Sequence, residues 1–76
     1  LAGLGRDEEA VADYGKAAQM GLDEAFLHDN LSMAYLRLGR AEEAEAAARR
    51  ALARDPVHWS ANVSLLEALM ARGKVE

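Results

Sequence analysis

The sequence predicts an all-α fold: a helix-turn-helix solenoid of four helices, open at both ends. The stretch LGRDEEA at residues 4–10 returns as LGRAEEA at residues 38–44. Such a period of 34 residues is typical of proteins that stack identical supersecondary units. Hydrophobic residues make up 51% of the chain but aromatic residues only 5%, so small side chains that suit close helix packing dominate.

The first predicted helix covers about Glu8 to Met20 and is followed by Gly21, a residue that commonly ends helices. Three of its residues occupy the positions that alanines occupy 34 residues later in the chain: Ala10, Tyr14 and Ala17. It is therefore expected to be the second helix of a hairpin. We interpret Leu1 and Ala2 as the remnant of an earlier helix.

The second predicted helix runs from about Glu24 to Leu38, with Asp23 placed to cap it. Apolar residues spaced by three and four positions give it one buried face, formed by Leu27, Leu31, Ala34, Tyr35 and Leu38. Gly39 tolerates the positive φ with which helices often end. A tight reversal of the chain is expected at this glycine.

The third predicted helix follows Gly39 after a very short connection. Its apolar face consists of Ala44, Ala47, Ala48, Ala51 and Leu52. Acidic residues lie in its first turn and arginines near its end, an order that complements the helix dipole. Because so few residues separate it from the second helix, the two are expected to form an antiparallel hairpin.

The fourth predicted helix extends from about Val57 to Arg72. Asp55 is expected to cap it, and Pro56 suits a first-turn position because its missing N–H has no partner there. We interpret Lys74 to Glu76 as the start of a later helix.

Composition excludes several classes of function. A net charge of −4 and a pI of 5.1 argue against nucleic-acid binding, which depends on clustered cations. There is no cysteine, and no apolar run approaches the ~20 residues of a membrane helix. His28 and His58 lack a recognised metal-ligand spacing, and no catalytic arrangement or cofactor motif is found. We predict no enzyme activity, metal or cofactor for this segment, and its localisation stays open.

The hairpin pattern resembles the tetratricopeptide repeat family. In the one complete copy, residues 25–58, five residues match the family pattern: Leu31, Tyr35, Ala44, Ala51 and Pro56. Ser32 replaces the usual glycine, His28 the tryptophan and Ala48 the phenylalanine. Residues 1–24 then form the end of a first repeat and residues 59–76 the start of a third, in which Leu66 occupies a position that is normally small.

The resemblance implies a superhelix whose first helices line a concave groove for a partner protein. The side chains expected in that groove are Phe26, Asp29, Met33, Leu36, Arg37, Ser60, Val63, Glu67 and Met70. Most of them are apolar, which favours a hydrophobic or amphipathic peptide or helix as the partner. Family members that clamp a carboxyl terminus use cations at groove positions, whereas this chain has Asp29, Met33, Ser60 and Ser64 there. That ligand is rejected for the groove.

Two other functions remain open at this point. Repeats that bury their faces on neighbours could assemble into homo-oligomers through exposed ends. Alternatively, the segment could be the non-catalytic repeat region of a larger bacterial enzyme, such as a glycosyltransferase or a sulfotransferase; the abundance of Ala and of Arg over Lys is typical of GC-rich bacterial genomes. A basic patch of Arg49, Arg50 and Arg54 is interpreted as a solvated outer face.

Overall fold

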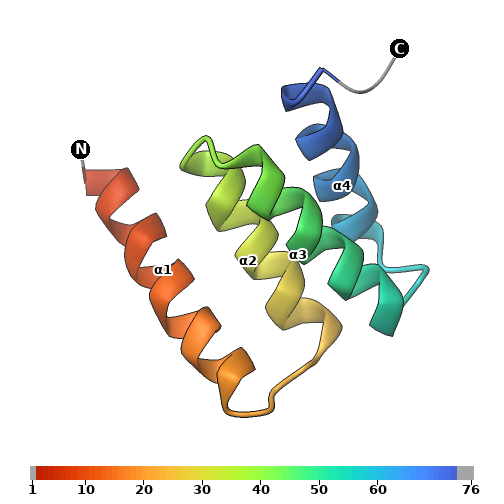
Figure 1. The fold of residues 1–76 in the computed structure, drawn as a ribbon, viewed down its shortest axis with the longest axis horizontal. Helices are drawn as coiled ribbons and strands as arrows, with labels where there is room; N and C mark the ends of the chain where they lie inside the picture. Colours follow the sequence, from red (N-terminus) through yellow and green to blue (C-terminus); the bar gives the residue numbers. More distant parts are fainter. Residues whose placement is uncertain (1, 74–76) are drawn as a thin grey trace.

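The chain forms four helices that lie beside one another in an open layer (Figure 1). A computed structural model describes residues 2–73, and its overall extents are 35 × 31 × 16 Å. The helices are α1 (Ala2–Gln19), α2 (Ala25–Arg37), α3 (Ala41–Arg54) and α4 (Trp59–Ala71). The helix α2 packs against all three others, whereas α1 contacts only α2 among the described helices. The layer therefore does not close into a bundle, which confirms the predicted all-α hairpin fold.

The α2–α3 hairpin holds most of the buried apolar residues. Its two helices contribute Leu27, Leu31, Ala34, Ala44, Ala47, Ala48 and Ala51, each of them buried. The alanines of α3 let its backbone approach α2 closely. The Ser32 hydroxyl of α2, which is fully buried, donates a hydrogen bond to the carbonyl oxygen of Ala44 of α3 at 2.8 Å. These residues belong to the apolar faces predicted for the second and third helices, whereas the other predicted members, Tyr35, Leu38 and Leu52, are only half-buried.

Gly39 makes the reversal between these two helices. Its φ of 78° lies in the left-handed region, and the backbone N–H of Arg40 donates to the carbonyl of Tyr35 at 2.8 Å. This pattern caps the last carbonyls of α2. Gly21 and Gly73 also have positive φ after α1 and α4. The predicted helix end at Gly39 is therefore correct.

The first copy of the heptapeptide does not form this turn. Residues 4–10 lie inside α1, and Gly5 continues the helix, so Ala2 belongs to α1 and is not the remnant of an earlier helix. The reversal at Gly39 is supported by the packing of α3 on α2, and no described helix packs before α1. Without that packing, residues 4–10 are more stable when they continue the helical hydrogen bonds than when they form a turn. Leu1 and residues 74–76, to which two predictions refer, lie outside the described residues.

Asp23 does not cap α2. The residue at the cap position is Glu24, whose side chain makes no capping hydrogen bond. The Asp23 carboxylate instead accepts from Nε2 of His28 at 2.6 Å and pairs with Arg54 of α3. His28 itself, which stands at the tryptophan position of the repeat pattern, is buried. Asp23 thus connects the α1–α2 link to α3.

The helix α4 begins two residues later than predicted. Its cap residue is His58, whose Nδ1 accepts a hydrogen bond from the backbone N–H of Ala61 at 3.2 Å. Asp55 ends α3, and its side chain accepts from the backbone N–H of Val57, so Asp55 and Pro56 belong to the turn before α4. The sequence rule favoured Asp over His at a helix start, whereas the turn places the imidazole there. None of the four helices in the described part of the chain is both long and apolar enough to span a membrane.

Two matched glycine substitutions are expected to have opposite effects on stability. Gly5→Ala should raise the free energy of unfolding by about 0.5–1 kcal/mol, because Ala is the better helix former and no atom lies within 4 Å of the added Cβ. Gly39→Ala should lower it by about 1–2 kcal/mol, because the site requires positive φ. Urea unfolding followed by circular dichroism measures both. Equal effects of the two substitutions would contradict the different conformations of the two heptapeptides.

Candidate partner-binding groove

A small cavity lies between α2 and α4, on the face of α2 predicted to meet a partner. Its volume is about 220 Å³, and it is lined by Met33, Leu36, Arg37 and Glu67. The Ser60 hydroxyl of α4 lies 3.8 Å from Sδ of Met33, which links the two walls. The structure therefore brings four of the predicted groove residues together, with apolar groups beside one cation and one anion.

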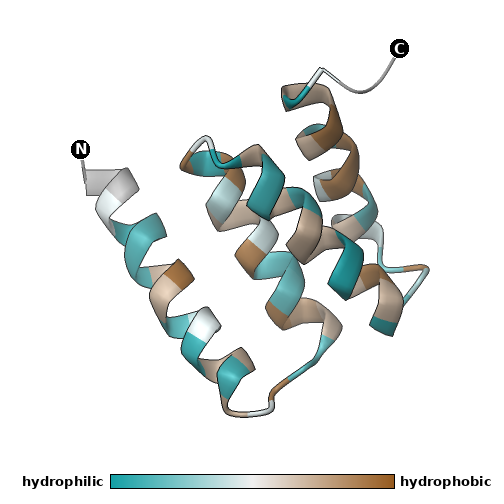
Figure 2. Ribbon diagram, viewed as in Figure 1, coloured by the Kyte–Doolittle hydropathy of each residue, from teal (hydrophilic) through white to brown (hydrophobic). Residues whose placement is uncertain are grey.

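The remaining apolar candidates lie outside the lining of this cavity. Phe26, Val63 and Met70 are all exposed to solvent, Met70 by 60% of its surface. Figure 2 shows hydrophobic residues along the last turns of α4, the helix that carries Met70. These side chains are accessible for contact with a partner.

Asp29 does not point into the groove, contrary to the expectation from the sequence. It is buried, with only 6% of its surface exposed, and its carboxylate accepts a hydrogen bond from the Ser64 hydroxyl at 3.3 Å. The packing of α4 on α2 covers this position. Asp29 thus joins the two walls of the groove and is not available to a partner.

Arg37 is held by a residue that the sequence did not single out. Its Nε donates to Oδ1 of Asp7, a buried side chain of α1, at 2.7 Å. Asp7 is the one residue in which the two heptapeptides differ, and Ala41 is its counterpart. The counterpart of Arg37 in α4 is Ala71, so both partners change together between the copies. That paired difference is the signal from which this contact could have been predicted.

The second wall of the groove is tied to α3 through a basic residue at the end of α4. Arg72 pairs with Glu45, and Glu45 also pairs with Arg49 at 3.0 Å. The hydrogen bond from Arg49, and after it that from Arg72, holds the pKa of Glu45 below its ordinary value. On the other side of the hairpin, Arg54 and then His28 lower the pKa of Asp23 in the same way.

The lowered pKa values of Asp23 and Glu45 predict that the free energy of unfolding decreases in acid. Since the pKa values of Asp23 and Glu45 are lower in the folded chain than in the unfolded chain, the unfolded state takes up protons first as the pH falls. Their contribution is therefore complete above the ordinary values of 3.8 and 4.5, and is lost as the pH falls through the lowered ones. Urea midpoints between about pH 6 and pH 3 should show this decrease.

The double variant Asp23→Asn, Glu45→Gln should show a shallower decrease of the urea midpoint with pH. A matched control is Glu9→Gln, an exposed residue of α1 with no ion pair among the described residues. A pH dependence that stays equally steep in the double variant and in the control would refute the assignment.

Comparison with known proteins identifies the hairpin that carries one wall of the groove. Residues 25–56 match the family model described as tetratricopeptide repeat. The match begins at the first residue of α2 and ends just after α3, so it covers the complete hairpin. No curated protein and no solved structure matches the chain.

Proposed function

Since residues 25–56 match the model of the tetratricopeptide repeat family, we propose that this chain is a protein-interaction module that binds a hydrophobic or amphipathic peptide between α2 and α4. Repeats of this family generally serve as non-catalytic scaffolds for protein partners. The finer proposal concerns the kind of partner and the surface that takes it. It is supported by the side chains at the cavity between the two helices.

The cavity at Met33 and Leu36 is the observation that carries the proposal. An unbranched thioether adapts to differently shaped guests, and the adjacent Leu36 adds a second apolar contact. Arg37 and Glu67 flank these groups and offer charges of both signs, which can fix the register of a peptide with polar residues on one side. At about 220 Å³, the cavity suits apolar side chains of such a peptide and not a buried cofactor.

A selection with random 16-residue peptides displayed on phage, using the 76-residue chain as bait, tests the proposal. Selected peptides should carry apolar residues at helical spacing. Met33→Asp combined with Leu36→Asp should weaken their binding at least tenfold, because it places unpaired carboxylates against apolar groups. Fluorescence anisotropy gives the dissociation constants, and circular dichroism verifies that the variant is folded.

The matched control is Val57→Asp, at an exposed residue of the α3–α4 turn away from the cavity lining. It should leave affinity within about twofold, since it adds the same charge elsewhere. Unchanged binding by the folded Met33→Asp, Leu36→Asp variant would rule out this groove as the binding surface.

The two other functions stated from the sequence stay predictions. Assembly through the ends would use the face of α4 that carries Leu66, a side chain that is half exposed. The hypothesis that this segment is the non-catalytic part of a larger enzyme is tested by sequencing the gene on either side of it.

A further inference from the structure

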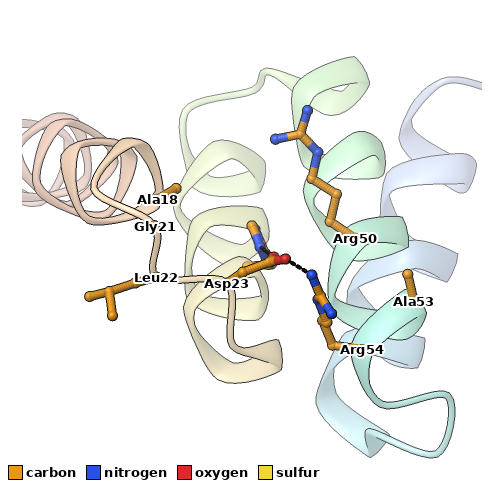
Figure 3. Close-up of a pocket in the computed structure, with 8 residues that line it drawn as sticks. Ala18, Gly21, Leu22, Asp23, Arg50, Ala53 and Arg54 are labelled. Atoms are coloured by element: carbon orange, nitrogen blue, oxygen red, sulfur yellow. Dashed lines mark hydrogen bonds and ion pairs between the residues drawn. The ribbon is translucent and has the colours of Figure 1, made fainter.

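A second and larger cavity lies on another side of α2, between the end of α1 and the outer surface of α3. Its volume is about 580 Å³. Figure 3 shows Arg50 and Arg54 rising from α3 on one side of it, with Ala18 and Leu22 on the opposite side. It contains no residue of the groove between α2 and α4. This cavity is therefore a separate surface from the groove of the proposed function.

An ion pair fixes the Arg54 guanidinium at this cavity and leaves some of its N–H donors free for a ligand. Its Nη2 pairs with Oδ2 of Asp23, whose other oxygen accepts from His28. Hydrogen bonds from Arg54 and His28 lower the pKa of Asp23, so this carboxylate stays ionised at neutral pH. Nε and Nη1 of Arg54 have no partner among the described residues. Since Asp23 fixes the guanidinium, less side-chain entropy is lost when a ligand binds.

Arg50 adds a second guanidinium one helical turn earlier. Residues four apart share one face of a helix, so both arginines border the same cavity. Within residues 2–73 Arg50 forms no ion pair, in contrast to its neighbour Arg49, which pairs with Glu45. Two guanidinium groups against the single carboxylate of Asp23 leave the cavity locally positive, although the whole chain has a net charge of −4.

His28 supplies an independent observation at the same place. Only 3% of the surface of His28 is exposed, and the residue lines the cavity. Its Nδ1 atom has no hydrogen-bond partner among the described residues. Unpaired buried polar atoms are uncommon and costly. His28, Arg50 and Ala18 also line an adjoining cavity of about 380 Å³, which extends along α1 and α3 to Tyr35. The two cavities together form a trench. Arg50 lines both parts of it and Arg54 the larger part, while Glu43, whose carboxylate pairs with Arg40, lines the smaller part together with alanines and Leu31.

We propose that this trench binds an acidic peptide segment, whose carboxylate is held by Arg50 and Arg54. A guanidinium presents its donors in a planar fork that matches a carboxylate. The trench is too large for a single small anion, and its alanine and leucine walls suit the apolar part of a peptide. Of the three arginines in the basic patch of the sequence, Arg49 then has a structural role in its pair with Glu45, and Arg50 and Arg54 bind the ligand.

NMR titration of the ¹⁵N-labelled 76-residue chain tests the proposal, with acetyl-Glu-Ala-Asp-Leu-Glu-amide as the probe. Backbone signals of residues 21–23 and 50–54 and the ring signals of His28 should shift. Arg50→Gln should weaken binding about tenfold, as expected for the loss of a charge-assisted hydrogen bond. Arg49→Gln is the matched control on the same helix and should leave the dissociation constant unchanged within about twofold.

Three further comparisons complete the test. The uncharged peptide acetyl-Gln-Ala-Asn-Leu-Gln-amide should bind at least tenfold more weakly, and equal binding overturns the proposal. An equal loss of affinity in Arg49→Gln and Arg50→Gln also overturns the proposal, because it would indicate attraction by diffuse surface charge. Inorganic phosphate that binds as tightly as the acidic peptide would show a small-anion site instead. Met33→Asp with Leu36→Asp should leave peptide binding here intact, so failures of this proposal and of the groove are distinguishable.

Discussion

Replacing Leu27 with Ala is expected to lower the free energy of unfolding by about 2–5 kcal/mol. The Leu27 side chain is only 4% exposed, and the neighbouring buried residues of α3 are alanines that cannot extend to fill the space it leaves. A chain of 76 residues has a total stability of roughly 4–11 kcal/mol. The loss is therefore a large fraction of the total, and the urea midpoint of the variant should be markedly lower, as measured by urea titration with circular dichroism at 222 nm.

Leu22→Ala is the matched control for this prediction. It removes the same atoms from a side chain that is 52% exposed in the α1–α2 link, so the change in stability should stay within about 0.5 kcal/mol. Equal losses in the two variants would show that the α2–α3 interface is not where the stability of this chain resides.

Ser32→Leu is expected to have the second largest effect, a loss of about 2–4 kcal/mol. Ser32 is fully buried where α2 and α3 approach each other, and its hydroxyl donates to the carbonyl of Ala44. Leucine would force the helices apart and remove the hydrogen bond, and each of these changes is destabilising. Urea titration gives the loss, and a lower melting temperature should accompany it.

The reverse substitution, Leu66→Ser, provides the comparison. Leu66 is the counterpart of Ser32 in the next repeat, but it is 50% exposed on α4 because no described helix packs there. Leu66→Ser should therefore change stability by less than about 1 kcal/mol. A small effect of Ser32→Leu, similar to that of Leu66→Ser, would mean that close approach of α2 and α3 is not required.

The candidate groove was only partly predictable from the sequence. Spacing along a helix places Met33, Leu36 and Arg37 on one face, and the structure brings them together with Glu67. The same spacing placed Asp29 in the groove, but that side chain is covered by α4 and bonded to Ser64. Periodicity gives the direction of a side chain around its own helix. It does not give the crossing of the neighbouring helix, which decides what is covered.

Charged contacts between helices were the least predictable feature. Asp23 looked like a helix cap, yet it pairs with Arg54, 31 residues away, and Asp7 holds Arg37 across 30 residues. Local rules compare a side chain only with the backbone groups next to it. A charged side chain also has access to partners brought close by packing, and a charge-assisted hydrogen bond to such a partner can be stronger.

The sequence by itself determined the helical hairpin of residues 25–56, its buried alanine face and the reversal at Gly39. These features depend on residue spacing and on backbone conformations that glycine adopts, and both are local properties. Only the tertiary structure decided that the nearly identical residues 4–10 and 38–44 adopt different conformations. A turn costs helical hydrogen bonds, so it forms where a second helix packs against the first, as α3 does on α2, and packing depends on the whole chain.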